Sequence, residues 1–139
     1  MITSKRNVSA YDGLPLDGGN RKIPNGPLFE PERVLRLVRD EALTVWARGA
    51  IEDAAKWEMD IPALCQLVGK AVMQGRYIGS EWCVQKPNGP WAASDAYKVT
   101  ISEWNPCARR ELDVTWYVKF SIAQTGSVLL SVSNHPEGC

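Results

Sequence analysis

Three segments near the C-terminal end of the chain alternate apolar and polar residues, and short turns separate them. They span 97–104, 114–122 and the shorter, less regular 128–133. A period of two predicts β-strands with one buried face, because successive side chains of a strand point to opposite sides of the sheet. In the middle strand the predicted core positions are Val114, Trp116, Val118, Phe120 and Ile122. The other face of that strand then carries Thr115, Tyr117, Lys119 and Ser121.

A further strand is predicted just upstream, over residues 77–84. The turn chemistry of residues 86–89, which contain an Asn-Gly pair, follows it, and such pairs are favoured in tight hairpin turns. A break at Asn105-Pro106 and the polar segment 124–127 separate the later strands. The second half of the chain therefore predicts a four-stranded antiparallel β-meander.

The first half of the domain shows helical spacing. A helix is predicted to begin near Pro31, because proline suits the first turn of a helix. A short extended stretch over 43–46 separates it from a second helix over about 48–57. Asp60 is an expected N-cap for a third helix that ends at Gly75. The fold class predicted is α+β, with about three N-terminal helices packed on one face of the meander.

Residues 1–27 contain repeated glycine, proline and asparagine and show no apolar periodicity. This composition predicts a flexible N-terminal arm. Residues 28–139 then form the α+β domain, because a chain of 139 residues has the usual length of one domain.

Composition and charge exclude several classes of function. Sixteen basic and sixteen acidic residues cancel, so binding of nucleic acid would need a local basic patch.

Apolar runs are too short for a membrane span and no signal-peptide stretch is visible, which predicts a cytoplasmic protein with no membrane partner. Four widely spaced cysteines and one histidine lack the spacing of a zinc site, and no nucleotide-binding or hydrolase motif occurs. Neither a metal nor a cofactor is expected.

Cationic and phenolic residues gather on the outward positions of the predicted strands, namely Lys98, Tyr117, Lys119 and His135. Near the strand ends lie Arg76, Lys86, Arg109 and Arg110, and Tyr97 offers a ring on which a base could stack. Such a set suits cleavage of RNA without a metal, which needs a proton acceptor, a proton donor and fixed positive charge at the phosphorus. The alternative is structural, because outward lysines on strands are usually solvated and protect sheet edges.

The order of these motifs resembles one family, the motility quorum-sensing regulator (MqsR) toxins, a branch of the RelE-like bacterial ribonucleases. Residues 34–38 resemble the family's first helix, and 50–68 resemble its "A…ALGxDxxxxCxxI" stretch. Its "FYKSM", "WQDVYR", "VYLKITV" and "VLIVSF" segments correspond to 76–80, 91–98, 116–122 and 128–133. The resemblance implies a RelE-like fold and a metal-independent endoribonuclease that cleaves mRNA. It also implies a cognate antitoxin, a DNA-binding protein encoded beside it.

The family pattern assigns roles to residues of this chain and also shows departures. The tyrosine and lysine of "VYLK" are Tyr117 and Lys119, and His135 lies near the family's C-terminal lysine. The position of the family's catalytic lysine in "FYK" is occupied here by Ile78, so Arg76 or Lys86 would have to replace that lysine. The glutamine of the family's "WQD" segment has no counterpart in this chain. Two functions stay open: an mRNA interferase with a rearranged site, and a catalytically silent RelE-like module that binds a partner protein or RNA.

Overall fold

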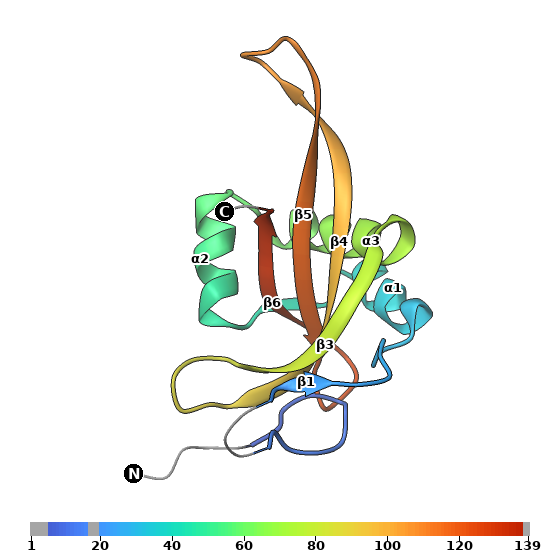
Figure 1. The fold of residues 1–139 in the computed structure, drawn as a ribbon, viewed down its shortest axis with the longest axis vertical. Helices are drawn as coiled ribbons and strands as arrows, with labels where there is room; N and C mark the ends of the chain where they lie inside the picture. Colours follow the sequence, from blue (N-terminus) through green and yellow to red (C-terminus); the bar gives the residue numbers. More distant parts are fainter. Residues whose placement is uncertain (1–5, 17–19, 138–139) are drawn as a thin grey trace.

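The computed structural model describes residues 6–16 and 20–137, which form three helices and one mixed sheet (Figure 1). The helices are α1 (Pro31–Arg39), α2 (Arg48–Lys56) and α3 (Ile61–Gln74). The strands are β1 (Lys22–Ile23), β2 (Leu43–Val45), β3 (Arg76–Val84), β4 (Trp91–Asn105), β5 (Arg110–Ile122) and β6 (Leu129–Pro136). Their order in the sheet is β1-β3-β4-β5-β6-β2. All neighbours are antiparallel except β2 and β6, which run parallel.

The prediction of three N-terminal helices on a four-stranded antiparallel meander is wrong. The sheet has six strands and is mixed, because β1 is added beside β3 and β2 is added in parallel beside β6. The helices do not all precede the strands, since β1 lies before α1 and β2 lies between α1 and α2. The two added strands contain only two and three residues, too few for alternation to appear.

The helix ends follow the capping signals of the sequence. Pro31 opens α1, and Asp60 caps α3 by accepting a hydrogen bond from the backbone N–H of Ala63 at 2.9 Å. Gly75 ends α3 where the chain turns into β3. A Cβ at this position would lie 2.5 Å from the carbonyl oxygens of both Ala71 and Lys98, so only glycine lets β3 start so close to β4. No helix in the described part of the chain is long and apolar enough to cross a membrane.

We expect Asp60→Ala to lower the free energy of unfolding by about 1 kcal/mol, the usual cost of losing an N-cap side chain. The substitution leaves the Ala63 N–H without its partner while removing little packing. Glu30→Ala is the matched control, because Glu30 occupies the N-cap of α1 without a side-chain cap hydrogen bond. Urea unfolding of both variants measures the difference, and equal losses would show that the Asp60 cap contributes nothing specific.

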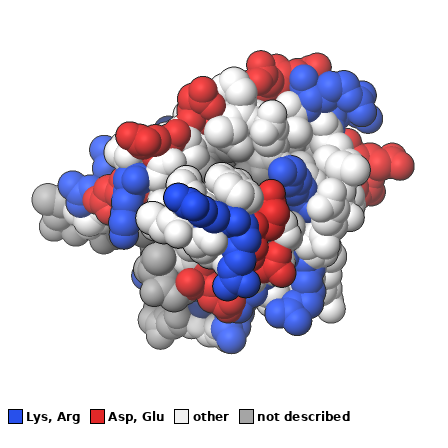
Figure 2. Space-filling view, turned by 90° about the horizontal axis from the view of Figure 1, so that it is seen from above, with Lys and Arg blue, Asp and Glu red and all other residues white. Residues whose placement is uncertain are grey.

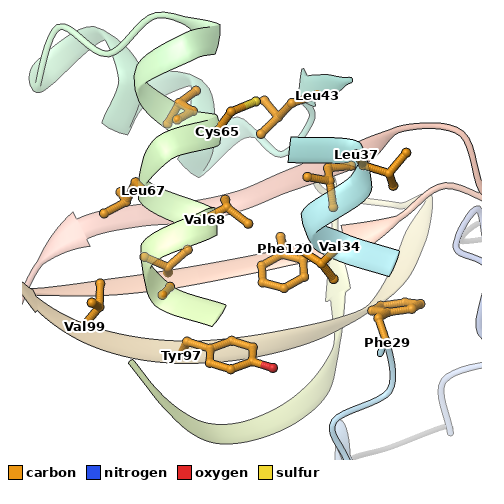
Figure 3. Close-up of a cluster of buried hydrophobic side chains, with 14 of the residues drawn as sticks. Phe29, Val34, Leu37, Leu43, Cys65, Leu67, Val68, Tyr97, Val99 and Phe120 are labelled. Atoms are coloured by element: carbon orange, nitrogen blue, oxygen red, sulfur yellow. The ribbon is translucent and has the colours of Figure 1, made fainter. Parts of the chain in front are cut away.

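The main core lies between the sheet and the helices α1 and α3 (Figure 3). Val118, Phe120 and Ile122 of β5 are fully buried there, and Trp116 is buried beside them. This confirms four of the five inward positions expected from the alternation of the strand, and Val114 is partly buried against the same core. The helix α2 lies beside β6 (Figure 1), where the Asp53 carboxylate accepts a hydrogen bond from the Asn134 N–H at 2.9 Å. The helices α1 and α3 therefore cover one face of β4 and β5. The side chains on the opposite face of these two strands are not covered by either helix.

The described residues of the expected N-terminal arm lie against one end of the sheet. Ala10 N–H donates to the carbonyl oxygen of Ile122 at 2.8 Å, and the β1 residue Ile23 pairs with Ser80 of β3. Ser9 is buried, and its hydroxyl accepts a hydrogen bond from the Ala93 N–H at 3.0 Å. Residues 1–5 and 17–19 of that expected arm lie outside the described part of the chain.

Candidate functional site

The outer face of the sheet, defined as the face of β4, β5 and β6 opposite α1 and α3, carries a row of three functional side chains. Lys98, Tyr117 and His135 are register partners across these strands. Each follows from strand alternation, because the neighbours Val99 and Val118 point into the core. The sheet thus brings together three of the four residues that the sequence assigned to catalysis.

The rings of Tyr117 and His135 stack on each other, with centroids 5.3 Å apart and an interplanar angle of 19°. His135 Nδ1 lies 3.1 Å from the carbonyl oxygen of Pro136. A proton on Nδ1 would be held by that oxygen and would leave Nε2 as a proton acceptor. The pair therefore offers a phenolic hydroxyl and an imidazole nitrogen side by side for proton transfer.

Lys119, the fourth residue assigned to catalysis, lies beside this row and is held in place. Its ammonium group forms an ion pair with Glu81 of β3 and lies 5.4 Å from the centroid of the Tyr117 ring. The Lys119 side chain is only 11% exposed, so the charge sits in a partly desolvated position. The ion pair and the ring contact together hold the Lys119 ammonium group next to the phenol ring of Tyr117.

The charge of Lys119 is permanent near neutral pH. Burial alone would lower the pKa of Lys119, but Cys83, Glu81 and Tyr117 together outweigh it and hold the pKa above its ordinary value. Burial also raises the pKa of the Cys83 thiol, so near pH 7 the negative charge comes from Glu81. Lys119 can therefore stabilise negative charge but cannot act as a proton acceptor.

Lys98 and Tyr117 each line a hollow of the surface. Arg76 is the register partner of Lys98, and both line an open cavity of about 450 Å³ together with Glu137. Glu137 forms an ion pair with Lys98, and the hydrogen bond from Lys98 lowers the pKa of Glu137. A smaller hollow of about 190 Å³ is lined by Tyr117 together with Lys22, Ile78, Gly79, Ser80, Glu81 and Ala96. The outer face thus has room for a ligand around the two side chains.

Two acidic partners, Glu81 and Glu137, were not found by sequence reasoning. Glu81 does have a local signal, because it occupies an outward position of β3 opposite Ser94. Glu137 has none, since its contact with Lys98 depends on how far β6 extends along β5. Ile78, which stands where the resembling family has a lysine, lines the smaller hollow with Tyr117.

Tyr97 does not belong to the site, although the sequence suggested that it contacts RNA. It is 5% exposed and its ring stacks on Phe120 in the core, with centroids 5.9 Å apart (Figure 3). Burial, followed by the nearby Asp95 and Tyr77, raises the pKa of Tyr97 to about 12. Tyr97 points into the core because it is adjacent to Lys98 in β4, and neighbouring side chains of a strand point to opposite faces of the sheet.

The remaining sequence candidates lie at the ends of the hairpins. Lys86 follows β3 and lines a cavity of about 570 Å³ beside α2, together with Trp46, Arg48, Ile51, Glu52, Gln85 and Pro87. Arg109 and Arg110 lie at the connection of β4 and β5. None of the three lines either hollow beside the Lys98–Tyr117 pair.

Acidic and basic side chains are interspersed over the end of the molecule that carries the β4–β5 connection (Figure 2). Within residues 6–16 and 20–137, no group of three or more His, Cys, Asp or Glu side chains is arranged to hold a metal ion.

Comparisons of the chain with protein-family models, with curated proteins and with solved structures give no match.

Proposed function

We propose that this protein is an endoribonuclease that cleaves mRNA without a metal ion and acts as the toxin of a bacterial type II toxin–antitoxin system. The observation that carries the proposal is the row of Lys98, Tyr117 and His135 on the outer face, with Lys119 fixed beside it. The order of sequence motifs, which resembles that of the MqsR toxins, supports the biological role.

The row supplies each group that the reaction needs. The 2′-hydroxyl of a ribose attacks the adjacent phosphorus, which forms a 2′,3′-cyclic phosphate and breaks the bond from phosphorus to the 5′-oxygen. Tyr117 and His135 divide the two proton transfers, one accepting the 2′-hydroxyl proton and the other donating to the leaving 5′-oxygen. Lys119, Lys98 and Arg76 provide positive charge for the phosphorane oxygens.

The proposed role implies a location and two partners. The mRNA substrate places the protein in the cytoplasm, and a cognate antitoxin encoded in the adjacent reading frame neutralises it. We expect that neighbour to contain a helix-turn-helix DNA-binding pattern. Expression of this chain alone is expected to arrest growth, and co-expression of the neighbour is expected to restore it.

We expect the purified protein to cut a mixed RNA pool into discrete fragments with 2′,3′-cyclic phosphate ends, equally well with and without EDTA. Lys98→Ala is expected to slow cleavage about tenfold, because one charge-assisted contact to the phosphate is lost. Lys70→Ala is the matched control, since Lys70 is an exposed lysine on α3 away from the outer face. Intact RNA under both conditions would reject the ribonuclease.

A second candidate function is a catalytically silent module that binds a partner protein or RNA. One observation favours it: Lys98 and Lys119 are both paired with carboxylates, Glu137 and Glu81, so their charges are partly neutralised. RNA binding without fragments would support this function. In that case affinity should fall steeply as salt rises, because phosphate contacts release counterions.

A further inference from the structure

The β4–β5 hairpin extends beyond the rest of the sheet (Figure 1). It carries an exposed tryptophan. On one side β3 pairs with β4 only as far as Lys98, and on the other β6 pairs with β5 only as far as Trp116. Beyond these points the two strands pair only with each other, up to Asn105 and Arg110. Trp104 lies in this ribbon and is 60% exposed.

A polar row connects the candidate site to Trp104. From Lys98, every second residue of β4 lies on the same side of the ribbon, which gives Thr100, Ser102 and Trp104. Thr100 and Thr115 share a hydrogen bond of 2.8 Å between their hydroxyl oxygens, and the Ser102 hydroxyl donates to the Asp113 carboxylate at 2.6 Å. At about 3.3 Å per residue, Trp104 lies roughly 20 Å along the strand from Lys98, and the row follows the twist of the ribbon.

Two arginines, Arg109 and Arg110, stand at the tip of the hairpin. Arg110 is the register partner of Asn105 and so lies on the side opposite Trp104. The turn before them is ordered by Asn105, whose side-chain oxygen accepts a hydrogen bond from the Ala108 N–H at 2.9 Å. Neither Arg109 nor Arg110 forms an ion pair within the part of the chain that the structure describes. Their guanidinium groups are exposed and available to phosphate oxygens.

We propose that this side of the hairpin, formed by Thr100, Ser102 and Trp104 together with Arg109 of the tip, binds single-stranded RNA. One base stacks on Trp104, Arg109 contacts the RNA backbone, and the RNA continues along the hydroxyl row toward Lys98 and Tyr117. That the other end of the bound RNA presents its scissile phosphate to Lys98 and Tyr117 rests on the proposed ribonuclease function. Single-strand sites span from roughly 4 nucleotides upward, which suits the length of the row.

The character of the surface favours RNA over a protein partner. Trp104 is an isolated exposed aromatic ring, since the other large exposed apolar side chains of the described residues lie outside this ribbon. A protein interface needs a contiguous buried apolar centre, whereas a base needs only one ring on which to stack.

Acidic side chains limit the electrostatic part of binding at the hairpin. Two carboxylates lie on the side of Trp104, because Glu111 is the register partner of Trp104 and Asp113 is that of Ser102. Glu103 lies on the opposite side and accepts a hydrogen bond from the Trp116 indole at 3.2 Å. Acidic and basic residues are mixed in the view onto the hairpin end of the molecule (Figure 2). Stacking on Trp104 should therefore contribute more than charge does.

The test measures binding of a fluorescent oligonucleotide of about 12 nucleotides, made with 2′-O-methyl riboses so that it cannot be cleaved. Trp104→Ala is expected to weaken binding about tenfold, in line with the loss of one stacked base. Trp104→Phe should restore part of the affinity, because it keeps a ring. Met73→Ala is the matched control, since Met73 is also a highly exposed apolar residue and lies on α3.

Salt dependence separates stacking from charge. Trp104→Ala should leave the slope of log affinity against log salt unchanged. Arg109→Ala should reduce that slope by about 0.7, the value for one lost phosphate contact on a single strand.

The outcomes for the hairpin and for the ribonuclease are distinguishable. Wild-type protein that fails to bind the oligonucleotide, or Trp104→Ala with wild-type affinity, would overturn the hairpin site, whether or not RNA is cleaved. Binding that depends on Trp104 in a protein that never cleaves RNA would support the hairpin site and reject the ribonuclease.

Discussion

Replacing Tyr117 by phenylalanine is expected to slow RNA cleavage by about 10²–10⁴-fold, the usual contribution of a side chain that transfers a proton in the transition state. The change removes only the hydroxyl group. The ring that stacks on His135 at 5.3 Å and lies 5.4 Å from the Lys119 ammonium group is retained. Loss of activity would then report on the hydroxyl and not on the packing of the outer face.

Single-turnover cleavage of a labelled RNA measures this effect, with affinity for an uncleavable oligonucleotide measured in parallel. Tyr11→Phe is the matched control, because Tyr11 packs against Trp82 at the other end of the sheet, with ring centroids 6.0 Å apart. A reduced rate with unchanged affinity assigns the hydroxyl to the chemical step. Cleavage by Tyr117→Phe at the wild-type rate would remove Tyr117 from the proposed mechanism.

The contribution of Lys119 to cleavage should not depend on pH in the neutral range. Its raised pKa keeps the ammonium group charged throughout the neutral range, so its contribution to cleavage should not change there. Any pH dependence between about pH 5 and 8 must come from a group that exchanges a proton in that range, and imidazole is the side chain that normally does so.

The division of the sheet into a core face and an outer face could be predicted from the sequence because strand alternation is local. The same period of two that buries Val118 and Phe120 places Tyr117 and Lys119 on the other side. Helix ends were equally predictable, since a cap such as Asp60 acts within a single turn. Applied strictly, the alternation would also have placed Tyr97 in the core, because it is adjacent to Lys98.

The edges of the sheet and the acidic partners of the lysines could not be predicted in this way. The pairing of β2 with β6 joins segments far apart in the sequence, and β1 is too short to show a pattern. The Lys119–Glu81 contact depends on the register of β3, β4 and β5, and a bulge between Tyr77 and Gly79 shifts that register. Such long-range features follow from packing and not from local periodicity.

Asp95→Ala is expected to lower the free energy of unfolding by about 3–5 kcal/mol, the range for removing one partner of a buried network of charged hydrogen bonds. Asp95 is fully buried in β4. Its carboxylate accepts hydrogen bonds from the N–H groups of Leu28 at 3.0 Å and Phe29 at 3.1 Å, and from the Ser80 hydroxyl at 2.6 Å. Alanine would leave the N–H groups of Leu28 and Phe29 without their side-chain acceptor, while the Ser80 hydroxyl keeps its hydrogen bond with the Tyr77 hydroxyl at 2.7 Å.

Urea unfolding followed by tryptophan fluorescence measures this loss. Asp113→Ala is the matched control, because Asp113 is exposed on β5 and its carboxylate accepts one hydrogen bond from Ser102. We expect the control to cost less than about 0.5 kcal/mol, as is usual for surface substitutions. Similar losses in the two variants would show that Asp95 does not hold the segment before α1 to the sheet.

The penalty for Asp95→Ala should also depend on pH, with a definite sign. Burial raises the pKa of Asp95, although the hydrogen bonds from Leu28, Ser80 and Phe29 act in the opposite direction. The folded protein therefore binds a proton at Asp95 more readily than the unfolded chain does. The contribution of Asp95 is greatest below the unfolded carboxyl value of about 3.9 and declines as pH rises through the raised folded value. The difference in unfolding free energy between wild type and Asp95→Ala should thus be smaller at neutral pH than in acid, and an increase toward neutral pH would show that the hydrogen bonds outweigh burial.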